Sequence, residues 1–160
     1  MSQPKGKVTI IGAGPGEPGL ITLRGFEALR QAEVVFYDYL VNPIILRQAG
    51  LLDKVPEEVL LVCLGKHGQG RLLSQQEINQ QLVESALTGK NVVRLKGGDP
   101  AIFGSTVEES TALEKAGIAY EVVPGVTAAL AASSTAGIPL TDRRWASAVA
   151  FVTGHECDDK

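Results

Sequence analysis

Short, almost continuously apolar runs alternate along the chain with stretches whose apolar residues recur at helical spacing. The runs Lys7–Ile11 and Glu33–Tyr37 are typical of strands buried on both faces of a parallel sheet. Between them, residues 20–32 carry apolar side chains three positions apart, which predicts one helical face turned toward a core. The chain therefore begins with a strand, a glycine-rich turn, a helix and a second strand.

The same alternation continues through most of the chain. Further strands are predicted at residues 59–65, in NVVRLKGG (91–98) and in AYEVVPG (119–125). A helix is predicted to begin at Ser74, because Glu77 completes a capping box. Two further helices are predicted over residues 106–117 and over residues 126–136, which are mostly small. Strands that alternate with helices predict an α/β fold with a mostly parallel sheet flanked by helices.

A last apolar run, SAVAFVTGH, begins at Ser147, after the turn GIPLTD. A buried strand needs neighbours with which to pair, and only five residues of the sequence follow this run. We therefore expect an N-terminal α/β domain over residues 1–140. Residues 141–160 would form a linker and the first strand of a truncated second α/β domain.

Composition and charge narrow the function classes. The 160 residues are 44% hydrophobic and carry a net charge of -3, which fits a globular domain and argues against binding to nucleic acid. The first apolar run is broken at Gly12, so it is too short for a signal peptide or a membrane span, and we expect a cytoplasmic protein. The two cysteines and two histidines are scattered and form no metal motif, so no metal site is expected.

The turn GPGEPG, from Gly14, satisfies the G-x-G-x-x-G pattern of dinucleotide-binding folds. Asp38 follows the second predicted strand about 20 residues later, where such folds place the acid that binds the ribose. However, Pro15 and Pro18 remove two backbone N–H donors that a pyrophosphate would need. Three interpretations remain open for this turn alone: a nicotinamide site, a site for a ligand without phosphate, and a tight connection that binds nothing.

Two more glycine-rich loops follow later strands, KGGDPAIFG (96–104) and PGVTAALAASSTAGIPL (124–140). The carboxyl ends of parallel strands share one rim, where ligands of open α/β sheets bind, so the three loops predict one site. Asp99 has two interpretations, as an acceptor for ribose hydroxyls or as the cap of a following helix. Thr127 and Ala128 open a helix of small residues, which favours either a planar ligand close to the backbone or tight packing on the sheet.

These segments resemble the tetrapyrrole methylase family, and within it the uroporphyrinogen-III C-methyltransferases. The resemblance lies in IGAGPGEPGLITLRG, VVFYDYLV, LGKHG with SQQEIN, VVRLKGGDPAIFG, VVPGVTAALAASSTAGIPLT and ASAVAFVTGH, which together cover almost the whole chain. It implies a site for S-adenosylmethionine, which has an adenosine and a sulfonium but no phosphate. It also implies a homodimer that methylates uroporphyrinogen III, and a cofactor folded between two domains, so that residues 1–160 alone should bind it poorly and be inactive.

The resemblance also implies roles for individual residues. Seven positions match family residues that contact S-adenosylmethionine: Pro15, Gly97, Gly98, Asp99, Ile102, Thr127 and Ala128. Asp38 matches the proton acceptor of the family and Lys66 the proton donor. An electron-rich pyrrole carbon would attack the sulfonium methyl, and a nearby carboxylate would stabilise the cationic ring or take up its proton.

The chain departs from the usual family pattern at three places. These are Tyr39, the pair His67 and Gly68, and the segment Ser105, Thr106 and Val107, where relatives have YDRLV, GKRAG and FGRGGEE. Uroporphyrinogen carries eight carboxylates, and arginine side chains commonly bind such groups, so the absence of these arginines should weaken its binding. Three alternatives therefore stand beside the main interpretation: a precorrin methyltransferase, a fragment of an NAD-dependent dehydrogenase, and a non-catalytic module derived from a methylase.

Overall fold

The computed structural model describes residues 4–54, 58–64 and 73–153, and it is built on a five-stranded parallel sheet. The strands are β1 (Lys7–Gly12), β2 (Val34–Tyr37), β3 (Leu60–Cys63), β4 (Asn91–Lys96) and β5 (Ala119–Val123). Their order across the sheet is β3-β2-β4-β1-β5, and every pairing is parallel. The α/β fold with a mostly parallel sheet is thus confirmed.

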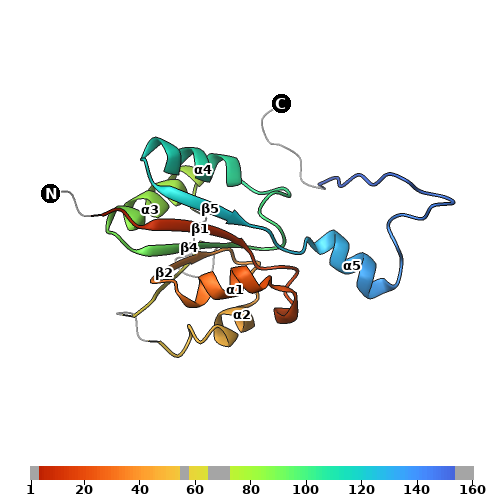
Figure 1. Ribbon diagram of the computed structural model, residues 1–160, viewed down its shortest axis with the longest axis horizontal. Coiled ribbons are helices and arrows are strands. Elements are labelled where there is room, and N and C mark those ends of the chain that lie inside the picture. The colour runs from red at the N-terminus through yellow and green to blue at the C-terminus, as the bar shows by residue number, and fades with distance from the viewer. Residues whose placement is uncertain (1–3, 55–57, 65–72, 154–160) are drawn as a thin grey trace.

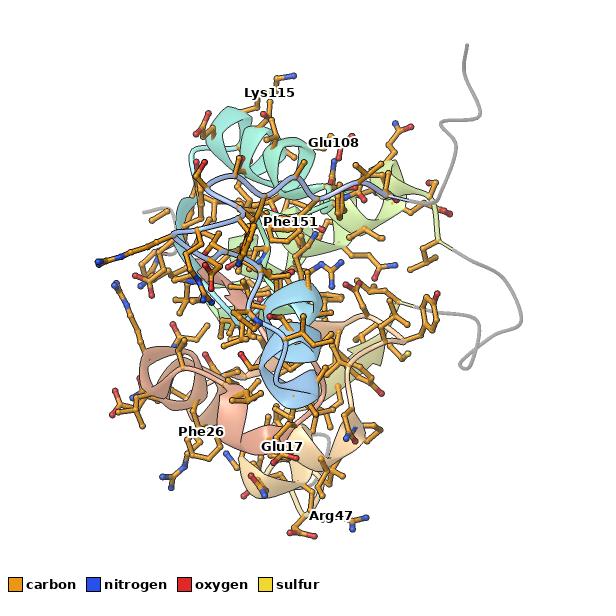
Figure 2. All side chains as sticks on the ribbon, turned by 90° about the vertical axis from the view of Figure 1, so that its right-hand side faces the viewer. Glu17, Phe26, Arg47, Glu108, Lys115 and Phe151 are labelled. Carbon is orange, nitrogen blue, oxygen red and sulfur yellow. The ribbon has the colours of Figure 1, made fainter. Side chains whose placement is uncertain are left out.

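Helices cover both faces of this sheet (Figure 1). The helices of the described residues are η1 (Pro18–Leu20), α1 (Leu23–Arg30), α2 (Pro43–Gln48), α3 (Gln75–Leu87), α4 (Thr106–Lys115) and α5 (Ala128–Ala136). Helices α1 and α2 lie on one face, and α3 and α4 lie on the other. Figure 2 shows the same layers from the side, with Glu108 and Lys115 of α4 at one extreme and Phe26 of α1 and Arg47 of α2 at the other.

Two hydrophobic cores lie on opposite faces of the sheet, because successive side chains of a strand point in opposite directions. In β1, Val8 and Ile10 face the core under α3 and α4, whereas Ile11 faces the core under α1 and α2. All three side chains are fully buried. This explains why β1 is an apolar run without alternation, as expected for a strand covered on both sides.

The predicted capping box is present, whereas helix α2 was not predicted. The Ser74 hydroxyl accepts from the Glu77 N–H, and the Glu77 carboxylate accepts from the Ser74 N–H at 2.8 Å. Helix α2 is only six residues long, which is too short to show a hydrophobic period. Its sequence markers are Asn42 as the N-cap and Pro43 at the first helical position.

Two expectations for the last third of the chain are not met among the described residues. Residues 147–153 form no strand, because no other strand lies beside them to share backbone hydrogen bonds. Helix α5 buries none of its residues and lies beyond the end of the sheet (Figure 1), so the tight packing considered for its small residues does not occur. The assignment of residues 141–160 to a second domain stays a prediction.

The strand order determines which loops meet at the carboxyl end of the sheet. Strand β1 lies between β4 and β5, so the three glycine-rich loops that follow these strands emerge side by side. Strand β2 lies on the other side of β4, which brings Asp38, the residue after β2, next to the loop that follows β4. None of the described helices is both long enough and apolar enough to span a membrane.

Candidate functional site

The three glycine-rich loops touch one another through their backbones. A Cβ on Gly12 would lie 2.6 Å from the Cα of Gly125 and 2.6 Å from the carbonyl oxygen of Gly98. A Cβ on Gly125 would lie only 2.3 Å from the same Gly98 oxygen. Gly12 ends β1 just before the first loop, and Gly98 and Gly125 belong to the second and third loops, so the lack of a side chain at Gly12 and Gly125 is what allows the loops to meet.

The amides of the first loop are already used in this contact. The N–H groups of Ala13 and Gly14 donate to the carbonyls of Lys96 and Gly98, at 2.7 and 3.1 Å, and Gly98 donates back to Gly14 at 2.8 Å. Gly14 and Gly98 both have positive φ, 77° and 64°, which glycine adopts without strain. A pyrophosphate would require these donors to be free, so the loop does not have the form of a phosphate cradle.

Asp99 joins the second loop to the third. Its Oδ2 accepts from the N–H of Gly125 at 2.9 Å, and its Oδ1 accepts from the N–H of Ala101 at 2.8 Å. The residues after Asp99 form turns, and α4 begins only at Thr106, so the carboxylate caps a turn rather than a helix. The helix-capping interpretation of Asp99 is therefore wrong, its carboxylate instead ties the second loop to the third, and its role as an acceptor for ribose hydroxyls stays a prediction.

Asn42 holds the first loop from the side of β2. Its Nδ2 donates to the carbonyl of Gly16 at 2.8 Å, while its Oδ1 accepts from the N–H of Ile44 as the cap of α2. One side chain therefore connects the glycine turn to the segment that carries Asp38.

We expect replacement of Asn42 by alanine to lower the free energy of unfolding by about 1 kcal/mol, the usual cost of a lost N-cap. The lost bond to Gly16 should also loosen the turn that carries Pro15. Urea unfolding of the variant beside the wild type measures the first effect. An unchanged midpoint would mean that neither hydrogen bond of Asn42 contributes to the fold.

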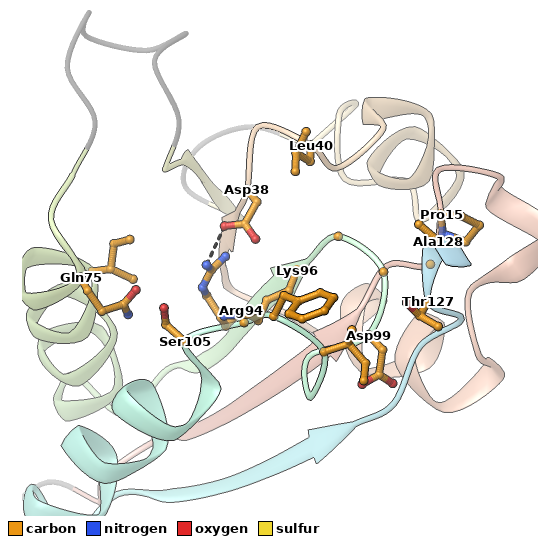
Figure 3. Close-up of a pocket in the computed structure, with 17 residues that line it drawn as sticks. Pro15, Asp38, Leu40, Gln75, Arg94, Lys96, Asp99, Ser105, Thr127 and Ala128 are labelled. Atoms are coloured by element: carbon orange, nitrogen blue, oxygen red, sulfur yellow. Dashed lines mark hydrogen bonds and ion pairs between the residues drawn. The ribbon is translucent and has the colours of Figure 1, made fainter. Parts of the chain in front are cut away.

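A cavity of about 590 Å³ opens where these loops meet (Figure 3). It is lined by all seven positions matched to cofactor contacts, namely Pro15, Gly97, Gly98, Asp99, Ile102, Thr127 and Ala128, and also by Asp38. Lys66 lies outside the described residues. The remaining lining residues, to which the sequence interpretation assigned no role in the site, are Gly14, Leu40, Gln75, Ile78, Arg94, Lys96, Phe103, Gly104 and Ser105.

The two ends of this cavity differ in chemistry. In Figure 3, Pro15, Thr127, Ala128 and Asp99 surround one end, whereas Gln75, Ser105 and the Asp38–Arg94 pair lie toward the other. At the first end the walls are backbone, small side chains and a carboxylate that already binds two amides. This end suits an uncharged group that lies close to the backbone. At the other end, the ionised side chains of Asp38 and Arg94 can contact a ligand.

A buried ion cluster lies beneath the second end. The Nζ of Lys96 donates to both oxygens of Glu109 at 3.1 Å, and the Nε of Arg94 donates to Glu109 Oε1 at 3.0 Å. An Nη of Arg94 also donates to Asp38 Oδ1 at 2.6 Å, which is the dashed contact in Figure 3. Two cations and two carboxylates thus balance in a site where Glu109 has no exposed surface.

The sequence interpretation missed Arg94, Lys96 and Glu109. One feature of the sequence could have identified the two cations. Arg94 and Lys96 stand two residues apart within the apolar run of β4 and therefore share one face of the sheet. Cations in a strand that is buried on both faces need buried carboxylates. The Asp38 carboxylate itself remains 29% exposed at the cavity.

Tyr37 precedes Asp38 and contributes no charge to this region. Burial raises the pKa of its phenol, and the adjacent Cys63 raises it further. The hydroxyl therefore stays protonated through the neutral range. Among the described residues, no group of three His, Cys, Asp or Glu side chains is arranged to hold a metal ion.

Comparison with known proteins points to one family. The pattern that defines the tetrapyrrole (corrin/porphyrin) methylases matches residues 7–159. Siroheme synthase of Baumannia cicadellinicola is 53% identical over 98% of this chain, and siroheme synthase 1 of Yersinia enterocolitica is 50% identical over 94%. The chain spans 32% and 31% of the length of these two relatives.

Solved structures agree with this assignment. A uroporphyrin-III C-methyltransferase from Thermus thermophilus has a TM-score of 0.72 and 43% identity over 86% of this chain and 55% of its own. A structure of the Thermus thermophilus enzyme complexed with S-adenosyl homocysteine has a TM-score of 0.70 and 40% identity, over 89% and 53%. A cobalt precorrin-4 methyltransferase has a TM-score of 0.71 and 37% identity, over 86% and 53%. The resemblance stated from the sequence is thereby confirmed, and the chain belongs to the tetrapyrrole methylase family.

Proposed function

We propose that this chain acts in the S-adenosylmethionine-dependent C-methylation of uroporphyrinogen III to precorrin-2, a step toward sirohaem and cobalamin. The observation that carries the proposal is that Asp38 and all seven positions matched to cofactor contacts line one cavity. Family membership and the S-adenosyl homocysteine complex of a structural neighbour support the choice of cofactor. A homodimer is part of the same proposal and rests on the resemblance alone, and a cytoplasmic location is proposed from the first apolar run, which is too short for a signal peptide.

The end of the cavity near Pro15 fits the ligand class because it offers no free phosphate site. The amides of Ala13, Gly14 and Gly98 are engaged between the loops, and both oxygens of Asp99 already accept amide hydrogens. An adenosine can lie against such backbone, and Ile102, which is 37% exposed, offers it an apolar surface. The same feature argues against the dehydrogenase alternative, in which a pyrophosphate would occupy the first loop.

S-adenosylmethionine, when bound, supplies a methyl group already activated by its sulfonium. What remains for the chain is to orient the acceptor and to handle charge and protons at the reacting ring. We propose that Asp38 receives the proton that leaves the ring after the methyl has been transferred. Its Oδ1 accepts a hydrogen bond from Arg94, and none of the described residues donates one to its Oδ2. Lys66 is proposed as the proton donor.

The acceptor must be recognised by groups beyond Arg94 and Lys96, the two cations among the described residues that line this cavity. Uroporphyrinogen carries eight carboxylates, whereas Arg94 and Lys96 are both paired with Glu109. Tyr39 and Ser105, which stand where relatives have arginines, offer no charge. A precorrin acceptor is the second candidate, since a cobalt precorrin-4 methyltransferase is nearly as similar in fold. Turnover of each acceptor, with the mass of the product, identifies the substrate and counts the methyl groups added.

Calorimetric titration of S-adenosylhomocysteine tests the cofactor assignment. We expect saturable binding to the chain extended by any downstream sequence that the gene encodes, weaker binding to residues 1–160 alone, and no binding of NAD to either. The reason is that a cofactor folded between two domains would find only one wall of its site on this chain. Binding of NAD in place of S-adenosylhomocysteine would overturn the proposal, and full methylation activity of the 160 residues alone would refute the need for a second domain.

A further inference from the structure

The inference concerns Glu109, a carboxylate on α4 that faces away from solvent and lies beneath the cavity. It has no exposed surface, and both of its oxygens accept from Lys96 Nζ at 3.1 Å. Its Oε1 also accepts from Arg94 Nε at 3.0 Å. The side chains of Arg94 and Lys96 are only 3% and 6% exposed. Charges so poorly solvated depend on their partners rather than on water.

Arg94 links this buried carboxylate to Asp38. Each nitrogen of its planar guanidinium has a separate acceptor: Nε has Glu109, Nη1 has the carbonyl of Leu95 at 3.2 Å, and Nη2 has Asp38 Oδ1 at 2.6 Å. The guanidinium group is rigid and planar. The hydrogen bond from Nε to Glu109 therefore also fixes the direction in which Nη2 of Arg94 points toward Asp38. The position of the Asp38 carboxylate is therefore set in part by a residue that it does not contact.

The charge balance gives Glu109 a second effect on Asp38. The negative charge of Glu109 balances Lys96 and part of the charge of Arg94, so Asp38 needs only one of its oxygens to pair with Arg94. Without that charge, Asp38 would be the sole anion near two buried cations and would be drawn toward them. Its Oδ2 would then no longer face the cavity.

We propose that Glu109 is a positioning residue: through Arg94 it holds Asp38 at the cavity with one carboxylate oxygen free for the reacting ring. This inference rests on the proposed function, since it assigns Asp38 its proton-accepting role. It makes Glu109 necessary for the rate of methyl transfer although it touches neither cofactor nor acceptor.

The variant Glu109→Gln tests this in the longest form of the protein that the gene encodes. We expect kcat for methylation to fall by about tenfold or more, in line with the loss of a general acid–base contribution, while cofactor affinity stays within about threefold. Glu114→Gln is the matched control, because Glu114 is an exposed carboxylate on the same helix, distant from the cavity. It should leave kcat unchanged. Unchanged kcat in Glu109→Gln would overturn the proposal.

A double-mutant cycle separates positioning from a merely structural role. If Glu109 acts through Asp38, adding Glu109→Gln to Asp38→Asn should lower kcat by less than about twofold further. A structural role would lower kcat by the same factor in both backgrounds and would contradict the proposal. Should Glu109→Gln fail to fold, Arg94→Lys keeps the buried charge but removes the fork, and it should give the same kcat defect.

Failure of the proposed function would be recognised separately. If the wild type methylates neither uroporphyrinogen III nor a precorrin, the assigned reaction is wrong, and crystal structures decide the positioning claim. Glu109→Gln should then show the Asp38 carboxylate displaced toward Lys96. A carboxylate that keeps its wild-type place in that variant would refute the inference on structural grounds alone.

Discussion

Replacement of Asp38 by asparagine is expected to lower kcat for methylation by about 10²-fold or more, the range typical of a lost general base. Asparagine has nearly the same shape and its amide oxygen can still accept from Arg94, so the loops should keep their places. Cofactor affinity should therefore stay within about threefold, because none of the contacts between the glycine-rich loops involves Asp38. Steady-state kinetics together with titration of S-adenosylhomocysteine measure the two effects.

Asp53→Asn is the control for this variant. Asp53 is an exposed acid outside the cavity, and its loss changes the net charge by the same amount. Wild-type turnover in Asp38→Asn would remove Asp38 from the mechanism. A joint loss of turnover and cofactor binding would instead assign the residue to the cofactor site.

Replacement of Gly125 by alanine is expected to separate the loops that form the cofactor end of the cavity. The new Cβ would lie 2.3 Å from the carbonyl oxygen of Gly98 and 2.7 Å from the Cα of Gly12, and backbone atoms cannot rotate out of the way. We expect the free energy of unfolding to fall by about 1–3 kcal/mol, the usual cost of an overpacked site. S-adenosylhomocysteine binding should weaken by more than about tenfold, because loop displacement misplaces every backbone contact.

Gly19→Ala is the matched control in the first loop. Its Cβ would meet only the Glu17 carboxylate, at 3.7 Å, which is an ordinary contact at the end of a flexible side chain. Denaturant unfolding and calorimetry on both variants distinguish close packing from a general intolerance of alanine. Equal stability and equal affinity in Gly125→Ala and wild type would show that the loops can separate without cost.

The α/β class and the shared rim of the three loops were predictable because both depend on local patterns. Apolar runs, helical spacing and the Ser74–Glu77 capping box are properties of neighbouring residues, and the parallel sheet follows from their alternation. The site residues of the second and third loops could be named in advance because the resemblance runs through VVRLKGGDPAIFG and VVPGVTAAL. Their roles as contacts stay predictions.

Other features needed the tertiary structure. Helix α2 is too short to produce a period, and the run from Ser147 has the composition of a strand but no partner among the described residues. Strand composition is local, whereas strand formation requires a second backbone with which to exchange hydrogen bonds. The same reasoning applies to Asp99, whose carboxylate binds an amide from a loop 26 residues away.

By itself, the sequence determined the strands and most helices, the three glycine-rich loops and the family, because each of these is encoded by residues close together in the chain. Only the tertiary structure showed which glycines allow the loops to pack together and which buried charges pair with one another. Gly12 and Gly125 meet across 113 positions of the sequence, and Arg94 links Asp38 to Glu109. Close packing and charge pairing require residues to be near one another in space, and the strand order β2-β4-β1-β5 brings these residues together.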